Sequence, residues 1–446
     1  MLLVSACSAG SPIPIGIAVD TTARFQTMTG WEATAQAGHE SASYPLYRDT
    51  LLALAAGDLG LNRLRLEVRS GVENTRDYYR EGMAGRLDGS AYRCGRYETV
   101  NDNDDPRVIN WDGFKFSELD RTVETLALPL RKAIAARGGR MVLNVTYVSF
   151  LRQCPQGRRY DHTDAAEYAE FVLATSMHLR DKYGLVPDLW EIILEPDNTD
   201  DWSSAAIGRA IVAVTARLRE NGFAARFVAP SNTAMEAALR YYDVIRTMPG
   251  VRGELAELSY HRYRINSKSV LREFAARARQ DSIGTAMLEH IGSDVDDLLD
   301  DLTIANVSAW SQYALAHASD ADRGGLYYIV DESDAKHPVV REGSRTRFLR
   351  QVFRTAQLGA TRIGASSDEA AARPVAFRNP DGRIGVAIRT TKSARLTVRG
   401  LPGGRYAITF ATAKLDRGAL PDAVIATRGN VVAEIPAAGV LTVLAR

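Results

Sequence analysis

Strand-like apolar segments alternate with helical patterns along most of the chain, and this alternation restricts the possible folds more than any other feature. The strand-like segments are residues 24–28, 61–68, 141–148, 189–194, 226–229, 255–260, 285–288 and 326–330. The helical patterns between them are residues 47–56, 119–136, 165–183, 204–220, 235–248, 269–279 and 303–318. Repeated strand–helix units favour a parallel sheet, and eight of them predict an α/β fold, the (β/α)8 or TIM barrel.

The C-terminal part of the chain has a different pattern. Strand-like runs continue there, but turn signals such as residues 379–382 (NPDG) and 402–404 (PGG) replace the helices between them. We therefore predict a barrel over residues 15–345 and an antiparallel β-sandwich over residues 346–446. Residues 15–22 could pair with the sandwich before the barrel begins.

The N-terminus carries a short apolar stretch that ends in a cysteine. Residues 2–7 (LLVSAC) are similar to the end of a bacterial lipoprotein signal, in which Cys7 would carry the lipid. Residues 1–14 would then be a signal remnant and tether. The protein would be exported to the periplasm, cell surface or medium, with membrane contact only through a lipid anchor at Cys7. A tail with a chance cysteine is the alternative.

Composition excludes several partners. The formal net charge of +1 over 446 residues offers no field for nucleic acid or an anionic membrane. No apolar run approaches the ~20 residues of a membrane span. Cys94 and Cys154 are an even pair that suits a disulfide in an oxidising compartment, with two buried thiols as the alternative. No cysteine and histidine cluster indicates a metal site.

Two of the strand-like segments end in a glutamate. Residues 189–194 run directly into Glu195 and Pro196, and residues 285–288 run into Glu289. The glutamates are 94 positions apart. A barrel uses about 31 residues per unit, so this spacing fits strands four and seven, whose C-terminal ends carry the active residues of such barrels. Paired carboxylates there predict glycosidic bond hydrolysis. Two surface glutamates are the alternative.

Other residues at strand ends fit the same site. Arg65, late in the second strand, would hold a nearby carboxylate ionised if it points into the barrel mouth; an ion pair with Glu67 is the alternative. His261 and Tyr263 are two apart on extended backbone and so point to the same side. Trp31 and Trp202 follow strands and could stack on a sugar ring. The predicted substrate-binding residues are Arg65, Trp31, Glu32, Ser149, Asn198, Trp202, Asn232, His261 and Tyr263.

Residues 70–112 are long for a loop in a compact barrel, which predicts an ordered wall beside the site. Within them, residues 101–105 (NDNDD) resemble a calcium loop only loosely, because the central glycine and terminal glutamate of such loops are missing. We favour a polar loop over a calcium site for this segment.

The chain as a whole, over residues 15–446, resembles a clan A glycoside hydrolase, closest to glycoside hydrolase family 30. The segments that carry the resemblance are residues 25–31, residues 60–66, Glu195-Pro196, the His-x-Tyr at residues 261–263, the strand before Glu289, and residues 348–364 (FLRQVFRTAQLGATRIG). The resemblance implies that Glu195 is the general acid/base and Glu289 the nucleophile. It also implies that anomeric configuration is retained and that no cofactor is needed.

One position departs from the family pattern. Clan A enzymes usually have an asparagine before the acid/base glutamate, where it binds the sugar 2-hydroxyl, and this chain has Leu194. Hydrogen bonds to that hydroxyl contribute several kcal/mol in the transition state. Asn232 or Asn198 could replace the missing amide, the substrate could differ at that carbon, or catalysis could be lost.

The sequence therefore predicts a retaining glycoside hydrolase that acts on a polysaccharide or oligosaccharide. The alternative from another class is a non-catalytic, glycan-binding surface lipoprotein on the same fold, because fold does not imply function. A barrel enzyme of other chemistry, such as a lyase, has no support from a metal set or phosphate loop.

Overall fold

The computed structural model describes residues 12–150, 154, 162–199, 201–224, 226–264, 267–318, 322, 324–426 and 429–446. The chain divides into two compact units. The barrel unit comprises Thr29–Ser293 and Asp300–Ser344, and the sandwich unit comprises Met1–Met28, Asp294–Leu299 and Arg345–Arg446. Cys7, the predicted lipid attachment point, lies outside the described residues.

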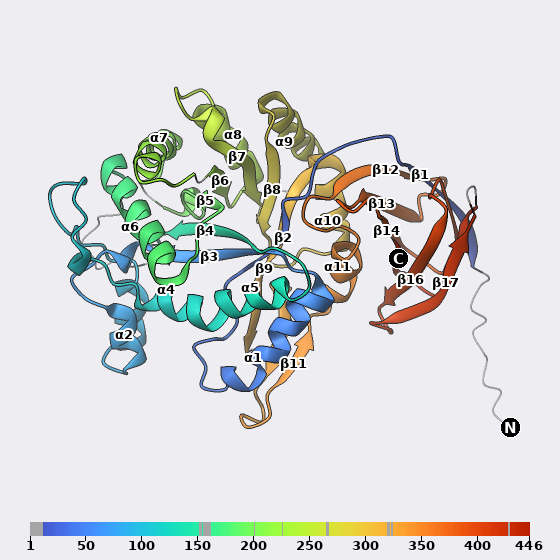
Figure 1. The fold of residues 1–446 in the computed structure, drawn as a ribbon, viewed down its shortest axis with the longest axis horizontal. Helices are drawn as coiled ribbons and strands as arrows, with labels where there is room; N and C mark the ends of the chain where they lie inside the picture. The colour runs from blue at the N-terminus through green and yellow to red at the C-terminus, as the bar shows by residue number, and fades with distance from the viewer. Residues whose placement is uncertain are drawn as a thin grey trace. The chain divides into compact units, whose positions relative to one another are not determined.

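The barrel unit contains a closed ring of parallel strands (Figure 1). Each strand pairs with the next in sequence, and β9 pairs with both β8 and β2, which closes the ring. The predicted (β/α)8 barrel is thereby confirmed. Its strands are β2 (Gly30–Thr34), β3 (Arg63–Arg69), β4 (Val142–Val148), β5 (Leu189–Glu191), β6 (Arg226–Asn232), β7 (Leu255–His261), β8 (Gly284–Glu289) and β9 (Val307–Ala318).

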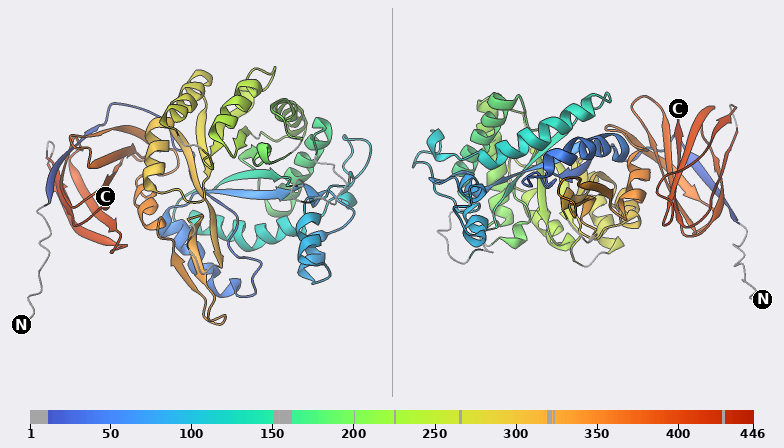
Figure 2. Two further views of the ribbon diagram at one scale, coloured as in Figure 1. Left: turned by 180° about the vertical axis from the view of Figure 1, so that it is seen from behind. Right: turned by 90° about the horizontal axis from the view of Figure 1, so that it is seen from below.

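Helices surround the strands, as both views of the barrel show (Figures 1 and 2). Their apolar faces pack on the outer faces of the strands, and polar side chains begin several of them: the Asp164 carboxylate accepts backbone N–H bonds at the start of α6. No described helix is both long enough and apolar enough to span a membrane. The main helices of the barrel unit are α1 (Tyr44–Ala53), α4 (Ser117–Thr122), α5 (Leu128–Ala135), α6 (Ala165–Tyr183), α7 (Ser204–Glu220), α8 (Met235–Ile245) and α9 (Lys268–Asp281). All but the last residue of the short helix α10 (Val295–Asp300) belong to the sandwich unit.

The first and last barrel strands differ from the prediction. The first is β2, after residues 24–28, and the last is β9, inside residues 303–318, which we predicted as a helix. Residues 326–330 lie in β10 (Leu326–Asp331), which continues the sheet beyond β9 and pairs with β11 (Val339–Glu342). The β9 segment is buried on both faces, so its apolar residues show no period of two and read as a helix.

The sandwich unit is built on one nine-stranded, mostly antiparallel sheet. Its first strand, β1 (Ile13–Asp20), covers most of residues 15–22 and pairs with β12 and β15. Alternating side chains such as Ile15 and Ile17 face an apolar core. The other elements of the unit are α11 (Thr346–Phe353), β12 (Thr361–Ser367), β13 (Ala372–Arg378), β14 (Ile384–Thr390), β15 (Ala394–Arg399), β16 (Gly404–Thr412), β17 (Gly418–Ile425), β18 (Val431–Ile435) and β19 (Gly439–Ala445).

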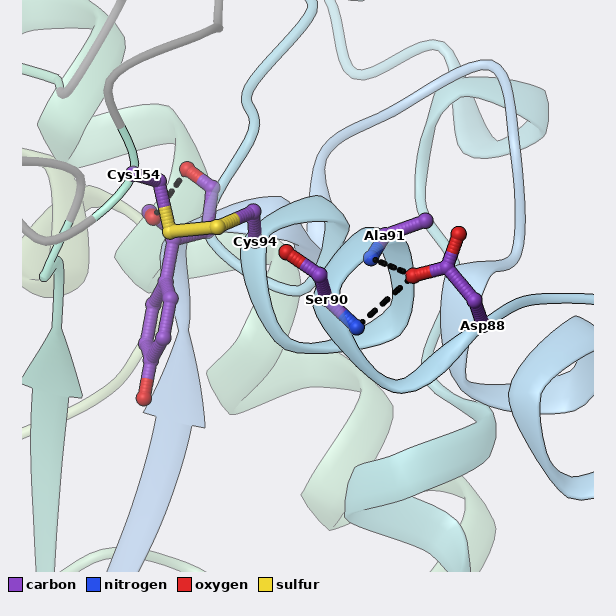
Figure 3. Close-up of a disulfide and its surroundings, with 7 residues drawn as sticks. Asp88, Ser90, Ala91, Cys94 and Cys154 are labelled. Carbon is purple, nitrogen blue, oxygen red and sulfur yellow. Dashed lines mark hydrogen bonds between the residues drawn. A yellow bond between two sulfur atoms is a disulfide. The ribbon is translucent and has the colours of Figure 1, made fainter.

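A long excursion leaves the barrel between β3 and α4. It contains two short helices, α2 (Tyr78–Met83) and α3 (Gly89–Gly95). The Asp88 carboxylate begins α3 by accepting N–H bonds from Ser90 and Ala91, each 2.8 Å long, and a disulfide joins Cys94 of this helix to Cys154 (Figure 3). Of the two alternatives for this cysteine pair, the structure forms the disulfide. We call residues 70–116 the wall.

Removing the disulfide should destabilise the barrel unit. A crosslink that spans 60 positions restricts the unfolded chain, which the loop-entropy relation converts to about 4 kcal/mol. We expect Cys94→Ser to lower the free energy of unfolding by about 2–4 kcal/mol, measured by urea denaturation. Reductant should destabilise the wild type equally and leave Cys94→Ser unchanged. Equal stability of oxidised wild type and variant would contradict this role.

Candidate active site

The two strand-end glutamates lie together at the C-terminal ends of the barrel strands. Glu195 follows β5 and Glu289 is the last residue of β8; each is 7% exposed. Glu195 has left-handed backbone angles of φ 51° and ψ 64°, which side-chain-bearing residues rarely adopt. Its N–H donates to the Ser231 carbonyl at 3.2 Å and its carbonyl accepts from the Asn198 N–H at 2.8 Å, so neighbouring backbone holds this strained turn.

The carboxylates are close to one another. One oxygen of Glu195, one oxygen of Glu289 and a ring nitrogen of His261 lie within 4.8 Å of each other. A metal ion could be held at such distances. Donors from the protein already bind all four carboxylate oxygens, however, and a cation would have to displace them. The geometry therefore favours two carboxylates that act directly.

Glu289 is held by two donors from other strands. Arg65 donates from Nη2 to Oε2, and the Tyr263 hydroxyl donates to Oε1 at 2.7 Å. Arg65 is fully buried, and the Thr34 hydroxyl fixes it by accepting from Nη2 at 2.7 Å. Burial and the charge of Glu289 raise the pKa of Tyr263 far above its ordinary value, so the phenol stays a donor at any working pH. These two contacts fix the position of the Glu289 carboxylate.

Glu195 is paired with a histidine. Its Oε1 binds His261 Nδ1 at 2.8 Å, and its Oε2 accepts from Asn198 Nδ2 at 2.6 Å. Burial opposes ionisation of Glu195, but the hydrogen bond and charge of His261, with Asn198, outweigh it and lower the pKa. Burial by itself would lower the pKa of His261. The hydrogen bond to Glu195 and the charges of Glu289 and Glu195 outweigh burial, so the pKa is raised. Both shifts favour the charged forms, so the contact is an ion pair between the Glu195 carboxylate and the His261 imidazolium.

Glu32 lies elsewhere and has to be removed from the predicted sugar-binding set. It is fully buried inside the barrel, where Arg63 Nε donates to its Oε2 at 2.5 Å and Asn144 donates at 3.2 Å. Arg63 also binds Glu257 at 2.8 Å. Burial raises the pKa of Glu32. This residue belongs to an ion network in the barrel interior, below the mouth.

The two predicted stacking tryptophans are also corrected. Trp31 of β2 is 1% exposed and is in register with Trp310 of β9. Trp202 is 2% exposed and packs against Tyr147 and Tyr168, with ring centroids 5.7 and 5.1 Å away. Neither indole leaves a face open for a sugar. Both contribute to the packing of the barrel.

Four positions bear on the missing asparagine. Leu194 is buried beside the turn and its side chain offers no hydrogen bond. Asn232, the last residue of β6, is fully buried, and its side-chain amide has no hydrogen-bond partner among the described residues. Ser149, directly after β4, is also buried. Asn198 is already engaged with Glu195, which leaves Asn232 as the available amide.

The structure adds residues that the sequence did not indicate. A pocket of about 300 Å³ lies where β2, β3 and β9 end, and its lining includes Gln36, Glu67, Arg69 and Glu118. The Tyr313 hydroxyl accepts from Gln36 at 3.3 Å. Burial first, then the charges of Glu67 and Glu289, raise the pKa of Tyr313. Tyr313 was missed because β9 was read as a helix. Asn306 could have revealed the strand, because it ends the preceding helix in a left-handed conformation.

The fold matches solved glycoside hydrolases along nearly the whole chain. The catalytic domain of a family 30 xylanase C from Talaromyces cellulolyticus aligns with a TM-score of 0.69 and 13% identity, covering 97% of this chain and 100% of that one. A family 30 endoxylanase from Clostridium papyrosolvens aligns with a TM-score of 0.65 and 16% identity over 97% and 100% of the two chains.

A third match is the endo-β1,6-glucanase BT3312, with a TM-score of 0.66 and 14% identity over 96% of this chain and 94% of that one. No protein-family model matches the chain, and no curated protein matches it in sequence. The chain therefore has the fold of family 30 glycoside hydrolases, as the resemblance implied. Identities this low establish the fold alone.

The Glu195–His261 pair predicts a defined pH dependence of stability. The raised pKa of His261 means that its contribution is full below its ordinary value of 6.5 and fades as the pH rises through the folded value. The lowered pKa of Glu195 means that its contribution is full above its ordinary value of 4.5 and fades as the pH falls. The pair therefore stabilises the fold most between these two values.

We expect His261→Asn to lower the free energy of unfolding by about 3 kcal/mol within that window, because breaking a buried pair leaves one charge without its partner. The difference from wild type should shrink below pH 4 and above pH 7, in urea denaturation from about pH 3.5 to 9. A difference that does not change with pH would show that the ionisation of this pair does not contribute to the stability of the fold.

Proposed function

We propose that this protein is a retaining glycoside hydrolase that cleaves O-glycosidic bonds of a polysaccharide or oligosaccharide. One observation carries the proposal: oxygens of Glu195 and Glu289 lie within 4.8 Å of each other at the C-terminal ends of the barrel strands. Retaining enzymes place their carboxyl groups about 5–5.5 Å apart, whereas inverting enzymes leave about 6.5–9.5 Å for a water molecule. The spacing supports the retaining mechanism.

In the first step, a Glu289 oxygen attacks the anomeric carbon and forms a glycosyl ester. Arg65 and Tyr263 hold the carboxylate for this attack. The bond from the anomeric carbon to the leaving oxygen breaks, and that oxygen receives a proton through Glu195. Water then attacks the anomeric carbon and loses its proton to Glu195. The bond from that carbon to the Glu289 oxygen breaks, which frees the Glu289 carboxylate and releases the sugar with retained configuration.

The proton for the leaving group comes from the Glu195–His261 pair. His261 Nδ1 binds Oε1 of Glu195, and Asn198 donates to the other oxygen, Oε2. A general acid must hold a proton near the working pH, and an isolated carboxyl with a lowered pKa would not. In our proposal the histidine stores the proton and passes it through Glu195 as negative charge develops on the leaving oxygen.

The sugar next to Glu289 occupies the adjoining pocket. Gln36, Glu67 and Arg69 there offer donors and acceptors that suit neutral sugar hydroxyls. Asn232 binds the 2-hydroxyl in place of the asparagine that Leu194 replaces, since its buried amide has no other partner among the described residues. The relatives named as xylanases and a β1,6-glucanase support a polysaccharide substrate.

The protein works outside the cytoplasm in this proposal. The Cys94–Cys154 disulfide persists in an oxidising compartment, and a further structural match is described as a conserved exported protein from Bacteroides fragilis, with a TM-score of 0.68 and 11% identity. Lipid attachment at Cys7 remains the corresponding prediction for the N-terminus.

Glu289→Gln should abolish turnover and spare folding. The amide cannot form the glycosyl ester, so we expect kcat on released-sugar assays to fall by about 10³-fold or more, with an unchanged circular dichroism spectrum. Glu273→Gln, on the exposed face of α9, is the matched control and should keep full activity.

Covalent labelling separates an enzyme from a non-catalytic glycan-binding protein, the alternative that Leu194 favours. A panel of 2-fluoro glycosides should label wild type at Glu289, as peptide mass spectrometry would show. An active Glu289→Gln variant, or a label on another residue, would refute the assignment of the nucleophile.

Asn232→Ala tests the 2-hydroxyl contact. Loss of a hydrogen bond that tightens in the transition state should lower kcat/KM by roughly 10–100-fold on an ordinary glycoside. On a 2-deoxy glycoside, wild type and variant should react at similar rates because the contact is already absent. An equal loss on both substrates would place the role of Asn232 in folding instead.

A further inference from the structure

Asp301 is a fully buried carboxylate that binds the strands on both sides of β8. It begins the helical turn at residues 301–305. The Tyr260 hydroxyl donates to its Oδ1 at 2.7 Å, and Arg262 Nη1 and Trp310 Nε1 donate to its Oδ2 at 3.0 and 2.9 Å. Tyr260 lies in β7, Arg262 directly follows it, and Trp310 lies in β9 (Figure 1). Asp301 therefore links the two neighbours of β8, the strand that ends in the candidate nucleophile.

Four consecutive residues at the end of β7 bind alternately to Asp301 and to the candidate active site. Tyr260 and Arg262 donate to Asp301. His261 and Tyr263, which alternate with them, bind the two candidate catalytic carboxylates. Successive side chains on extended backbone point to opposite sides. A rotation of this segment about its own axis would therefore move both sets of contacts together.

The pairing of β7 with β8 is irregular at the same place. The register shifts between Tyr260 and His261, so that one residue of β8 is left out of the ladder before Glu289. Irregular pairing of this kind bends a strand and re-aims its side chains. After β7, the Arg262 N–H donates to the Glu289 carbonyl at the long distance of 3.3 Å. The side-chain bonds to Asp301 therefore hold the segment where regular pairing stops.

Stability alone does not account for this buried ion pair. Burial raises the pKa of Asp301, and the charge of Arg262 with the bonds from Tyr260 and Trp310 offsets only part of this effect. The ionised carboxylate therefore costs free energy in the fold. Replacing a buried ion pair by apolar side chains of similar volume is often neutral or stabilising. What the hydrogen bonds of Asp301 add is a fixed orientation of the groups that donate them.

We propose that Asp301 is a positioning residue that aims His261 and Tyr263 at the two candidate catalytic carboxylates. It acts only through Tyr260 and Arg262, from the opposite side of the segment. The inference rests on the proposed glycosidase function, because it assigns to Asp301 the alignment of the nucleophile and the proton donor of that reaction. Misplacing such groups by about 1 Å can lower a rate by about 10²-fold.

Asp301→Asn tests the proposal by separating kcat from KM. The amide keeps the size of the side chain but loses its charge and one acceptor oxygen. We expect kcat to fall by roughly 10–100-fold while KM changes less than about threefold, in assays well below the Tm of the variant. A wild-type kcat would overturn the proposal, because Asp301 would then serve only stability.

Asp243→Asn is the matched control. Asp243 of α8 is another carboxylate that binds an arginine, since Arg277 donates to its two oxygens at 2.8 Å each. This pair joins two helices, and Asp243 is partly exposed. The same substitution there should leave kcat and KM as in wild type.

A double-mutant cycle on stability gives a second test that does not require turnover. His261→Asn removes the contact with Glu195, and its effect on the urea midpoint is measured in wild type and in Asp301→Asn. Changes at sites without shared partners are additive. If Asp301 aims His261, the effect should be smaller in the Asp301→Asn background, because the contact is already weakened there. Equal effects in the two backgrounds would overturn the proposal.

Arg262→Lys replaces Asp301→Asn if that variant does not fold. Lysine keeps the positive charge but not the planar fork of donors. The same fall in kcat and the same reduced effect of His261→Asn are expected, and wild-type values in both measurements would overturn the proposal. A wild type without turnover on any glycoside would refute the proposed function instead, and the stability cycle would still decide whether Asp301 positions His261.

Discussion

The candidate site depends on one buried cation, the guanidinium of Arg65. Moving an ion from water into a protein interior costs several kcal/mol, so such a group persists only where opposite charge and hydrogen bonds surround it. Burial would lower the pKa of Arg65, but the carboxylates of Glu289, Glu191 and Glu32 outweigh burial and raise it. Because Arg65 is fixed by Thr34 and donates to Glu289, the position of the candidate nucleophile follows from the charge balance inside the barrel.

The same strand extends this balance further into the barrel. On β3, side chains two positions apart share a face, so Arg63 and Arg65 both point inward while Leu64 and Leu66 pack outward. Arg63 neutralises Glu32 of β2 and Glu257 of β7. The barrel interior therefore contains two layers of ion pairs. Arg63 forms the lower layer with Glu32 and Glu257, and Arg65 forms the upper layer with Glu289. Glu32 takes part in the lower layer, which explains why it does not reach the substrate.

The wall is held by a covalent link. Inside the barrel, Arg63 and Arg65 bind buried carboxylates, whereas Cys94 of the wall is joined to Cys154 by a disulfide. A crosslink of this kind stabilises a segment that has no large apolar core of its own.

Local sequence patterns determined much of this molecule. The alternation of strands and helices predicted the barrel, the turn-rich C-terminal part predicted the sandwich, and strand-end positions indicated Glu195, Glu289, Arg65, His261 and Tyr263, because a parallel barrel brings all its C-terminal strand ends to one side. Only the tertiary structure decided which buried residue faces which neighbour. Strand register placed Glu32 below the mouth, packing covered Trp31 and Trp202, and chain closure made β9 a strand. Periodicity records that a residue is buried, whereas register and closure, which depend on contacts distant in sequence, set its partners.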